Sequence, residues 1–304
     1  MNNLTVLGAV LGSGLLGCGS SEGPRTDGPR TAAHAPSHSP ATPSRSPAAP
    51  SAPAGALASP PAGRKPPTMA PGPAGLTPVF LRGPRAGTAG AGTHGKVVAL
   101  TFDADMTADQ GARAASGEHF DNPELIALLR RLKVPSTVFM TGRWAQEYPA
   151  QTRSIGTDPL FEIANHSYRH YAFTSPCYGL PVVEEADMRD DVRRAFAAFR
   201  KAGARNVVPY FRFPGGCYDD AALRTLASEK VTAVQWDVVS GDAFAKDADA
   251  VAEQVLDGVT PGSLVVMHCT RSAAPVTAEA VRRVVPELRR RGYRFVKVSE
   301  LMRG

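Results

Sequence analysis

The chain has 304 residues, of which 20% are charged and 43% hydrophobic, and its formal net charge is +6. Residues 1–95 carry seven basic and two acidic side chains, whereas residues 96–304 carry 27 basic and 26 acidic ones. Binding to nucleic acid needs a basic folded face, so the nearly neutral C-terminal part argues against that class, and we expect no nucleic-acid partner.

The N-terminus contains an apolar segment, Leu4–Leu16, which is too short to span a bilayer but suits the core of a signal peptide. It ends in a Leu-Leu-Gly-Cys sequence that resembles a bacterial lipobox, in which the cysteine, here Cys18, is lipidated. We therefore expect residues 1–18 to be a lipoprotein-type signal peptide. The mature protein would then be exported and lipid-anchored to the outer face of the bacterial cell membrane. The alternative is a plain secretory signal, because no Lys or Arg lies near Met1, and the protein would then be secreted.

Proline, alanine and serine dominate the stretch that follows. Between Gly19 and Arg85 lie 16 of the 27 prolines of the chain. Such a composition cannot bury enough apolar surface to offset the entropy of ordering it. The sequence thus predicts a disordered linker over residues 19–93 and one domain over residues 94–304.

The C-terminal part alternates apolar runs with amphipathic ones. Lys96–Phe102 is continuously apolar, which is typical of a strand buried on both faces. A capping Asn122 followed by Pro123 predicts the start of a helix. Some seven strands alternating with helices predict an α/β fold with a parallel sheet, open or closed into a barrel, and functional groups at the C-terminal strand ends. The remaining predicted strands are 136–141, 161–164, 207–213, 231–239, 263–267 and 293–298, and the remaining helices are 184–201, 219–229, 247–257 and 277–291.

Polar side chains stand at these predicted strand ends. A lone histidine is more often a surface or core residue than a ligand, but five strand ends that all carry such groups are hard to attribute to chance. The residues concerned are Asp103, Asp105, His166, His170, Arg212, Asp242 and His268.

The spacing of His166 and His170 suggests a metal site. On one helical turn, residues four apart place their imidazoles on the same side, about 6 Å apart at Cβ. A carboxylate would complete a three-ligand set with open positions for water. We expect one divalent metal ion there, with zinc as the default for an exported protein and cobalt, nickel or iron as alternatives.

Together these motifs resemble those of polysaccharide deacetylases of the NodB-homology type, carbohydrate esterase family 4. The resemblance runs from Lys96 to near the C-terminus. It implies a distorted (β/α) barrel and a metal-dependent hydrolase, usually acting on N-acetylated sugars, with an acetylated polysaccharide as substrate. The five motifs are Thr101–Asp105, Asn165–His170, Arg212–Gly216, Trp236 through Asp242, and Val266–His268.

The same resemblance suggests a role for each residue in a reaction in which metal-activated water attacks the acetyl carbonyl. The ligands are Asp105, His166 and His170; Asp103 is the base and Arg212 its partner; a backbone N–H near Gly215 holds the oxyanion; His268 is the acid, supported by Asp242; and Trp236 contacts substrate.

Two departures from the family pattern affect these roles. Ala104 stands where the family usually has a second aspartate, so either Asp105 reaches the metal or Asp103 takes over ligation. The usual Asp-Trp pair is replaced by Asp242-Ala243-Phe244, so an aromatic wall is expected one residue later.

Several alternatives stay open. An esterase that removes O-acetyl groups from a xylan-type polymer would use the same chemistry, and a domain that has lost its metal or base would only bind glycan. We expect a monomer. Of the three cysteines Cys177, Cys217 and Cys269, export favours one disulfide and one buried thiol, with the pairing undetermined.

Overall fold

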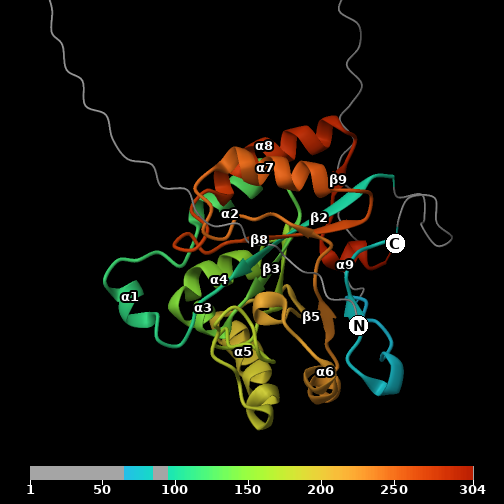
Figure 1. Cartoon of the computed structure of the whole chain (residues 1–304). Coiled ribbons are helices and arrows are strands. Elements are labelled where there is room, and N and C mark those ends of the chain that lie inside the picture. The colour runs from blue at the N-terminus through green and yellow to red at the C-terminus, as the bar shows by residue number, and fades with distance from the viewer. Residues whose placement is uncertain (1–64, 85–94, 304) are drawn as a thin grey trace, which may run out of the picture. The chain divides into compact units, whose positions relative to one another are not determined.

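The computed structural model describes residues 65–84 and 95–303 (Figure 1). Within them, nine parallel strands form one sheet in the order β1-β6-β5-β4-β3-β2-β8-β7, with β9 paired to β2. The predicted α/β, distorted-barrel fold is confirmed. The strands are β1 (Val79–Phe80), β2 (Val97–Ala104), β3 (Ser136–Met140), β4 (Phe161–Asn165), β5 (Val207–Phe211), β6 (Thr232–Val234), β7 (Val238–Val239), β8 (Ser263–His268) and β9 (Arg294–Phe295).

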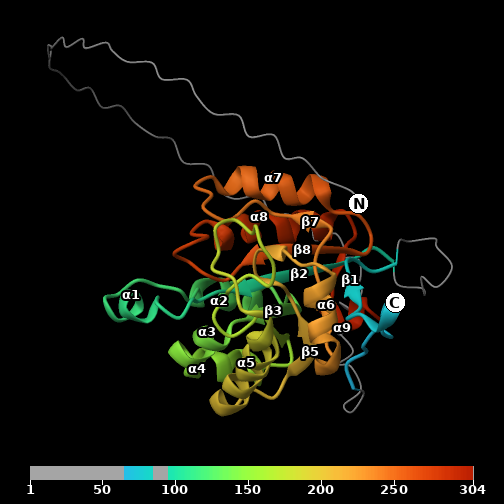
Figure 2. The ribbon, with the colours of Figure 1, turned by 60° about the horizontal axis from the view of Figure 1, so that its bottom comes forward.

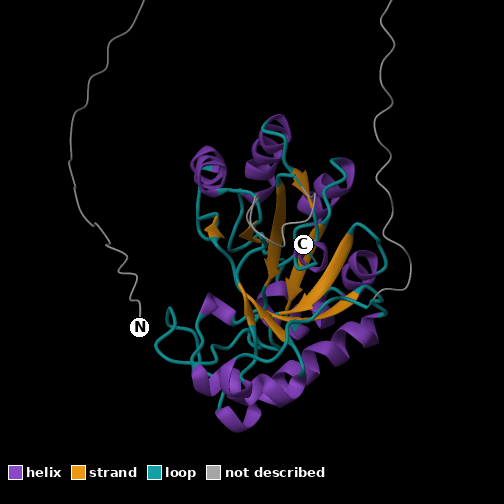
Figure 3. Cartoon of the chain, turned by 90° about the vertical axis from the view of Figure 1, so that its right-hand side faces the viewer, coloured by secondary structure: helices purple, strands orange, loops and turns teal. Residues whose placement is uncertain are grey.

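Helices surround this sheet on its outside (Figure 3). In two views α7 and α8 lie side by side along β2 and β8, and α1 projects away from the rest of the domain (Figures 1 and 2). The helices are α1 (Gly111–Ala115), α2 (Pro123–Arg131), α3 (Gly142–Glu147), α4 (Pro149–Gly156), α5 (Met188–Ala202), α6 (Asp220–Leu226), α7 (Ala248–Gly258), α8 (Thr277–Arg290) and α9 (Val298–Leu301).

The connection between β6 and β7 requires the sheet to curl. Val234 and Val238 are four residues apart, so their Cα atoms lie at most about 14 Å apart. In the strand order, six strand spacings separate β6 from β7, which in a flat sheet would amount to about 29 Å. The sheet therefore bends round into an incomplete barrel. The single strand predicted over 231–239 is wrong for this reason. The chain leaves β6, next to the edge strand β1, after Val234 and joins the opposite edge of the sheet as β7 at Val238.

Burial of both faces of β2 explains why its sequence is mostly apolar. Val98, Leu100 and Phe102 pack in the cluster beneath α2, α7 and α8. Ala99 packs in a second cluster with residues such as Tyr210. Both faces are buried, and the inner one, which includes Asp103, is enclosed by the curled sheet. The functional side chains at the strand ends therefore belong to the inner face.

Other element boundaries differ in places from the prediction. Asn122 caps α2 as expected, its side chain accepting a hydrogen bond from the N–H of Leu125. The predicted strand 293–298 is instead the short β9 followed by α9. The sequence analysis missed α1, α3 and α4. They are short, and α3 depends on the buried Trp144 rather than on a long repeat.

The segment 65–84 corrects the predicted boundary of the linker. Its strand β1 pairs with β6, and both the N–H and the hydroxyl of the buried Thr77 donate to the Leu223 carbonyl. Arg82 pairs with Asp237 at 2.9 Å. This part of the proline-rich stretch belongs to the domain because its few apolar and polar side chains find partners on the sheet edge. The rest of the predicted linker, apart from residues 65–84, lies outside the described residues.

One disulfide joins Cys177 to Cys217, and Cys269 is a buried free thiol. This confirms the expected single bridge and assigns its pairing. The predicted signal peptide 1–18, including Cys18, lies outside the described residues. Among the residues that the structure describes, no helix has the length and apolar character to cross a membrane.

Candidate active site

Three polar side chains lie at the C-terminal ends of β2, β5 and β8. Asp103 is the penultimate residue of β2, and so lies within the strand rather than after it; His268 ends β8; and Arg212 directly follows β5. Asp103 and Arg212 are buried, whereas the His268 side chain is 24% exposed. A site that substrate can enter needs at least one functional side chain that is open to solvent, and His268 meets this requirement beside the buried Asp103 and Arg212.

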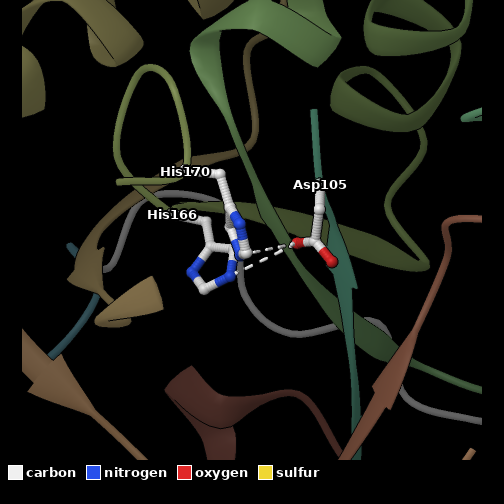
Figure 4. Close-up of side chains that lie close together, drawn as sticks. All are labelled: Asp105, His166 and His170. Atoms are coloured by element: carbon white, nitrogen blue, oxygen red, sulfur yellow. Dashed lines mark ion pairs between the residues drawn. The ribbon is translucent and has the colours of Figure 1, made fainter. Parts of the chain in front are cut away.

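Asp105 and the two histidines converge on one point (Figure 4). Oδ1 of Asp105 lies 3.3 Å from Nε2 of His166 and 3.7 Å from Nε2 of His170. The two imidazole rings are 5.0 Å apart between centroids and inclined at 60°. One oxygen and two ring nitrogens thus lie within 4.8 Å of one another.

A tight loop after β4, rather than a helical turn, brings the two imidazoles together. Ser167 and His170 have left-handed backbone φ values of 71° and 56°. The Asn165 side chain accepts from the N–H of Ser167, and the hydroxyl of Ser167 accepts from the N–H of His170. The expected helix is therefore wrong although the expected convergence is right. The hydrogen bonds of the Asn165 and Ser167 side chains hold the loop in this conformation, and the four-residue spacing of the histidines does not specify it.

The way β2 ends explains how Asp105 can act as a metal ligand although Ala104 stands where the family usually has an aspartate. Ala104 alternates with Asp103 and joins the apolar cluster beneath the helices. The strand ends there, and the N–H of Asp105 donates to Oγ1 of Thr270 at 2.8 Å. With this bond the chain leaves the hydrogen-bonding pattern of the sheet after Ala104. The Asp105 carboxylate then faces the two histidines.

The electrostatics of the three groups suit a cation. Burial raises the pKa of Asp105, but the adjacent His170 and His166 outweigh it and hold that pKa well below its usual range. Burial lowers the pKa of His170 to about 4, so this ring is neutral at pH 7. Burial also lowers the pKa of His166, but Asp103 and Asp105 overcome this and raise it. The two carboxylates thus favour positive charge at this point, which a divalent metal ion would supply.

Among the described residues, Oδ1 of Asp105 is a buried oxygen without a hydrogen-bond partner. An anionic oxygen left unpaired beside two imidazole nitrogens is costly unless a cation occupies the space. His166 is further oriented by its Nδ1, which lies 2.9 Å from the Arg212 carbonyl oxygen, as is usual for a ligating histidine. Asp105, His166 and His170 therefore form a divalent metal site.

The expected pair of Asp103 and Arg212 is present at 2.6 Å between Oδ1 and Nη1. Arg212 is fully buried, and its other nitrogens donate to the carbonyl oxygens of Val234 and Gln235. The remaining oxygen of Asp103, Oδ2, lies 3.6 Å from Nε2 of His166. One carboxylate oxygen is thus fixed, and the other faces the metal site.

His268 forms the opposite wall with Asp242. Nδ1 of His268 lies 2.7 Å from Oδ1 of Asp242, and its N–H donates to Oδ2 at 2.7 Å. Burial lowers the pKa of His268, but the Asp242 carboxylate more than compensates and raises it to about 10. The imidazole is therefore cationic at neutral pH, with Nε2 free of Asp242.

The remaining predicted residues lie around this centre. Gly215 has a φ of 64° and contacts the loop that carries Cys177. The half-buried Trp236 lies against Gly216, with the Arg212 guanidinium 5.4 Å from its ring. Phe244, the expected shifted aromatic wall, is 81% exposed.

Sequence reasoning missed the residues that hold these groups in place. Buried Asp191 of α5 accepts from the N–H of Tyr168 and from Arg169, which anchors the histidine loop. Ser240 and Thr277 donate to Asp242. Periodicity places Asp191 on a helix but gives no sign that its partner is a loop residue 23 positions earlier.

Fold and site together define a barrel with a metal centre of the hydrolase type. Residues 90–234 match the polysaccharide deacetylase family. The chain is 28% identical over 193 residues to a chitooligosaccharide deacetylase of Bradyrhizobium sp., which covers 60% of this chain and 84% of the relative. It is 27% identical over 211 residues to a peptidoglycan-N-acetylglucosamine deacetylase of Bacillus cereus. This match covers 68% of this chain and 89% of the relative.

A solved structure shows the same fold. A family 4 carbohydrate esterase pseudoenzyme from Bacillus anthracis superimposes with a TM-score of 0.58 and 23% identity, covering 77% of this chain and 69% of that one. Residues 90–234 are therefore a polysaccharide deacetylase domain. The resemblance expected from the sequence motifs is confirmed.

Proposed function

We propose that the protein removes N-acetyl groups from a glycan of N-acetylated amino sugars, of the peptidoglycan or chitin type. The observation that carries this proposal is the convergence of Asp105, His166 and His170 on one point, beside the Asp103 carboxylate. The activities named for the Bradyrhizobium and Bacillus cereus relatives support an amide of an amino sugar as the substrate.

A divalent ion held by Asp105, His166 and His170, which we propose to be zinc, would polarise the acetyl carbonyl and acidify a water molecule. The chain's own residues move the protons. Oδ2 of Asp103 takes the proton of the attacking water, while Arg212 holds Oδ1 and so fixes the carboxylate's direction. A carboxylate fixed in this way need not reorient during the reaction.

The breakdown of the tetrahedral intermediate needs a proton on the leaving nitrogen. His268 is cationic at neutral pH because of Asp242, so Nε2 can donate this proton as the C–N bond breaks. The backbone N–H of Gly215 is our candidate for holding the oxyanion, and loss of such a donor typically costs about 3 kcal/mol. The amine and acetate are then the products.

We also propose that the protein is exported and anchored by a lipid on Cys18. The support is the sequence of residues 4–18 alone. In that position, the domain would reach acetylated glycan outside the membrane, with the proline-rich stretch as a spacer.

Acetate release from an N-acetylglucosamine oligomer, from peptidoglycan and from acetylated xylan tests the proposed activity. We expect release from the first two, loss of activity with a chelator, and recovery with zinc or cobalt. Release from xylan alone would make the protein an O-acetyl esterase. No release from any of them with any divalent metal would leave a glycan-binding domain, and His166→Ala serves as the inactive control.

A further inference from the structure

We propose that Tyr178 is a platform on which a sugar ring of the acetylated glycan stacks, next to the sugar that is deacetylated. This inference rests on the proposed function and adds a residue that determines glycan binding. Three observations support it: the anchoring of the loop that carries Tyr178, the exposure of its ring, and the closeness of that ring to Gly215.

The loop is fixed at its base and near its tip. At the base, Ala172 donates to the Pro181 carbonyl and accepts from the N–H of Val183. Nearer the tip, the disulfide joins Cys177 to Cys217, just beyond Gly215 and Gly216. The hydroxyl of Thr174 also donates to Asp219 at 2.6 Å. Tyr178 is thus held on a covalently anchored loop.

Despite this anchoring, the side chain of Tyr178 is not used in packing. The residue is 90% exposed, the highest value among the large hydrophobic residues that the structure describes. Its backbone has a φ of 47°, a left-handed conformation that is unfavourable for a bulky side chain. Glycine or asparagine would fit this position better as far as folding is concerned. A large aromatic ring at such a position, contributing little burial, points to a role in recognition.

The ring lies close to Gly215, our candidate for holding the oxyanion. A Cβ atom built on Gly215 would lie 3.4 Å from Cδ2 of Tyr178 and 2.6 Å from the sulfur of Cys177, so the loop tip covers this glycine. Gly215 is three residues after Arg212, and their Cα atoms are therefore at most about 11 Å apart. The Arg212 carbonyl in turn contacts the His166 ring. A glycan with one sugar over the metal site would thus reach Tyr178 with the neighbouring sugar.

Tyrosine has the right chemistry for this partner. One face of a pyranose ring presents C–H bonds, which pack on an aromatic face, while the sugar hydroxyls remain in water. Tyrosine offers a large contact area with few rotatable bonds, so little conformational entropy is lost when it binds. Because the loop is already anchored, ordering it adds little further cost.

The affinity of the full-chain protein for an N-acetylglucosamine pentamer tests the proposal. It is measured by titration calorimetry after removal of metal, so that no turnover occurs. We expect Tyr178→Ala to weaken binding about 2- to 12-fold, which corresponds to the roughly 0.5–1.5 kcal/mol of an aromatic contact. Tyr178→Trp should retain affinity. Val182→Ala, at a 43% exposed position of the same loop, is the matched control and should bind as the wild type does.

A second variant separates recognition from folding. Tyr178→Asn suits the left-handed backbone, so we expect its melting temperature to equal or exceed that of the wild type while its affinity for the pentamer falls. Equal affinity of the wild type and both the Ala and Asn variants would overturn the proposal, as would a wild type that binds no pentamer. If the wild type binds the pentamer through Tyr178 yet releases no acetate with metal restored, the proposed function fails and the platform stands.

Discussion

Asp103 and His268 are register partners on the adjacent parallel strands β2 and β8. The carbonyl oxygen of Asp103 also accepts a hydrogen bond from the N–H of Cys269, at 2.7 Å. Neighbouring strands lie about 4.8 Å apart, so the side chains of the expected proton acceptor and proton donor start from adjacent backbone positions at the same end of the sheet. The sheet itself sets this separation.

Replacing His268 with Gln should leave metal binding intact and slow the reaction. The side chain pairs with Asp242 and is not one of the three groups that converge on the metal site. Loss of a general acid reduces kcat by roughly 10²–10⁴-fold. Metal content by elemental analysis and kcat for acetate release from the pentamer provide the check. Loss of metal equal to that of His166→Ala would show that His268 is a ligand instead.

Asp242 should control the alkaline limit of activity. The acid must be protonated to act, so kcat declines as the pH rises past the pKa of His268, which Asp242 raises to about 10. The Asp242→Asn variant lacks the carboxylate that raises the pKa of His268, whereas the burial that lowers this pKa remains. The alkaline limb of the pH profile should therefore move to lower pH. If the alkaline decline of kcat stays at the same pH in this variant, a group other than His268 causes that decline.

The two aspartates of the first motif should differ in metal retention. We expect Asp105→Asn to lose most of the bound metal, because Oδ1 of Asp105 lies at the point where both histidines converge. Asp103→Asn should keep its metal but lose turnover, since its Oδ1 is engaged by Arg212. Elemental analysis of both proteins, with wild type as reference, decides the matter. Metal retained in the first and lost in the second would reverse the two roles.

Arg212→Met should destabilise the fold strongly. It leaves the Asp103 carboxylate buried without its partner, and breaking a buried ion pair in this way costs about 3–5 kcal/mol. The double variant Asp103→Leu with Arg212→Met removes both charges and should recover part of that loss. Chemical denaturation of both variants measures the difference. A double variant no more stable than the single one would mean that the bonds of Arg212 to Val234 and Gln235 matter more than the ion pair.

Truncation should separate the packed segment 65–84 from the rest of the N-terminal region. Removal of residues 1–64 should leave the melting temperature of the domain unchanged. Removal of 1–93 also deletes β1 and the bonds of Thr77 and Arg82. At about 1 kcal/mol for each hydrogen bond, the cost is a few kcal/mol, or some 6–12 °C. Calorimetric melting of the two proteins provides the comparison, and equal melting temperatures would contradict the packing of β1.

The histidine pair shows where sequence reasoning succeeds and why its geometry could still be wrong. Four-residue spacing after a predicted strand indicated that His166 and His170 act together, and they do converge. The reason given, a helical turn, is wrong, because side chains of Asn165 and Ser167 hold an irregular loop there. Residue type and position limit the chemistry, but a loop's path depends on its hydrogen-bond partners. One of these, Asp191, comes from a distant helix.

The linker boundary failed for a related reason. Composition describes how much apolar surface a segment can bury by itself, and residues 65–84 can bury little. They are ordered through the edge of β6 and the carboxylate of Asp237, which local composition does not report. The prediction of one strand over 231–239 failed likewise, since nothing in a continuous apolar run shows that its two halves belong to β6 and β7, which lie six strand positions apart in the sheet.

The sequence alone determined the alternation of the main strands and helices, the burial of both faces of β2, and the set of side chains available for chemistry, because these follow from local periodicity and residue type. Only the tertiary structure decided which carboxylate completes the metal site, which cysteines pair, and that Tyr178 lies near Gly215. Each of these is a contact between segments far apart in the chain. Its geometry is fixed by the curvature of the sheet and by bonds that no single stretch of sequence contains.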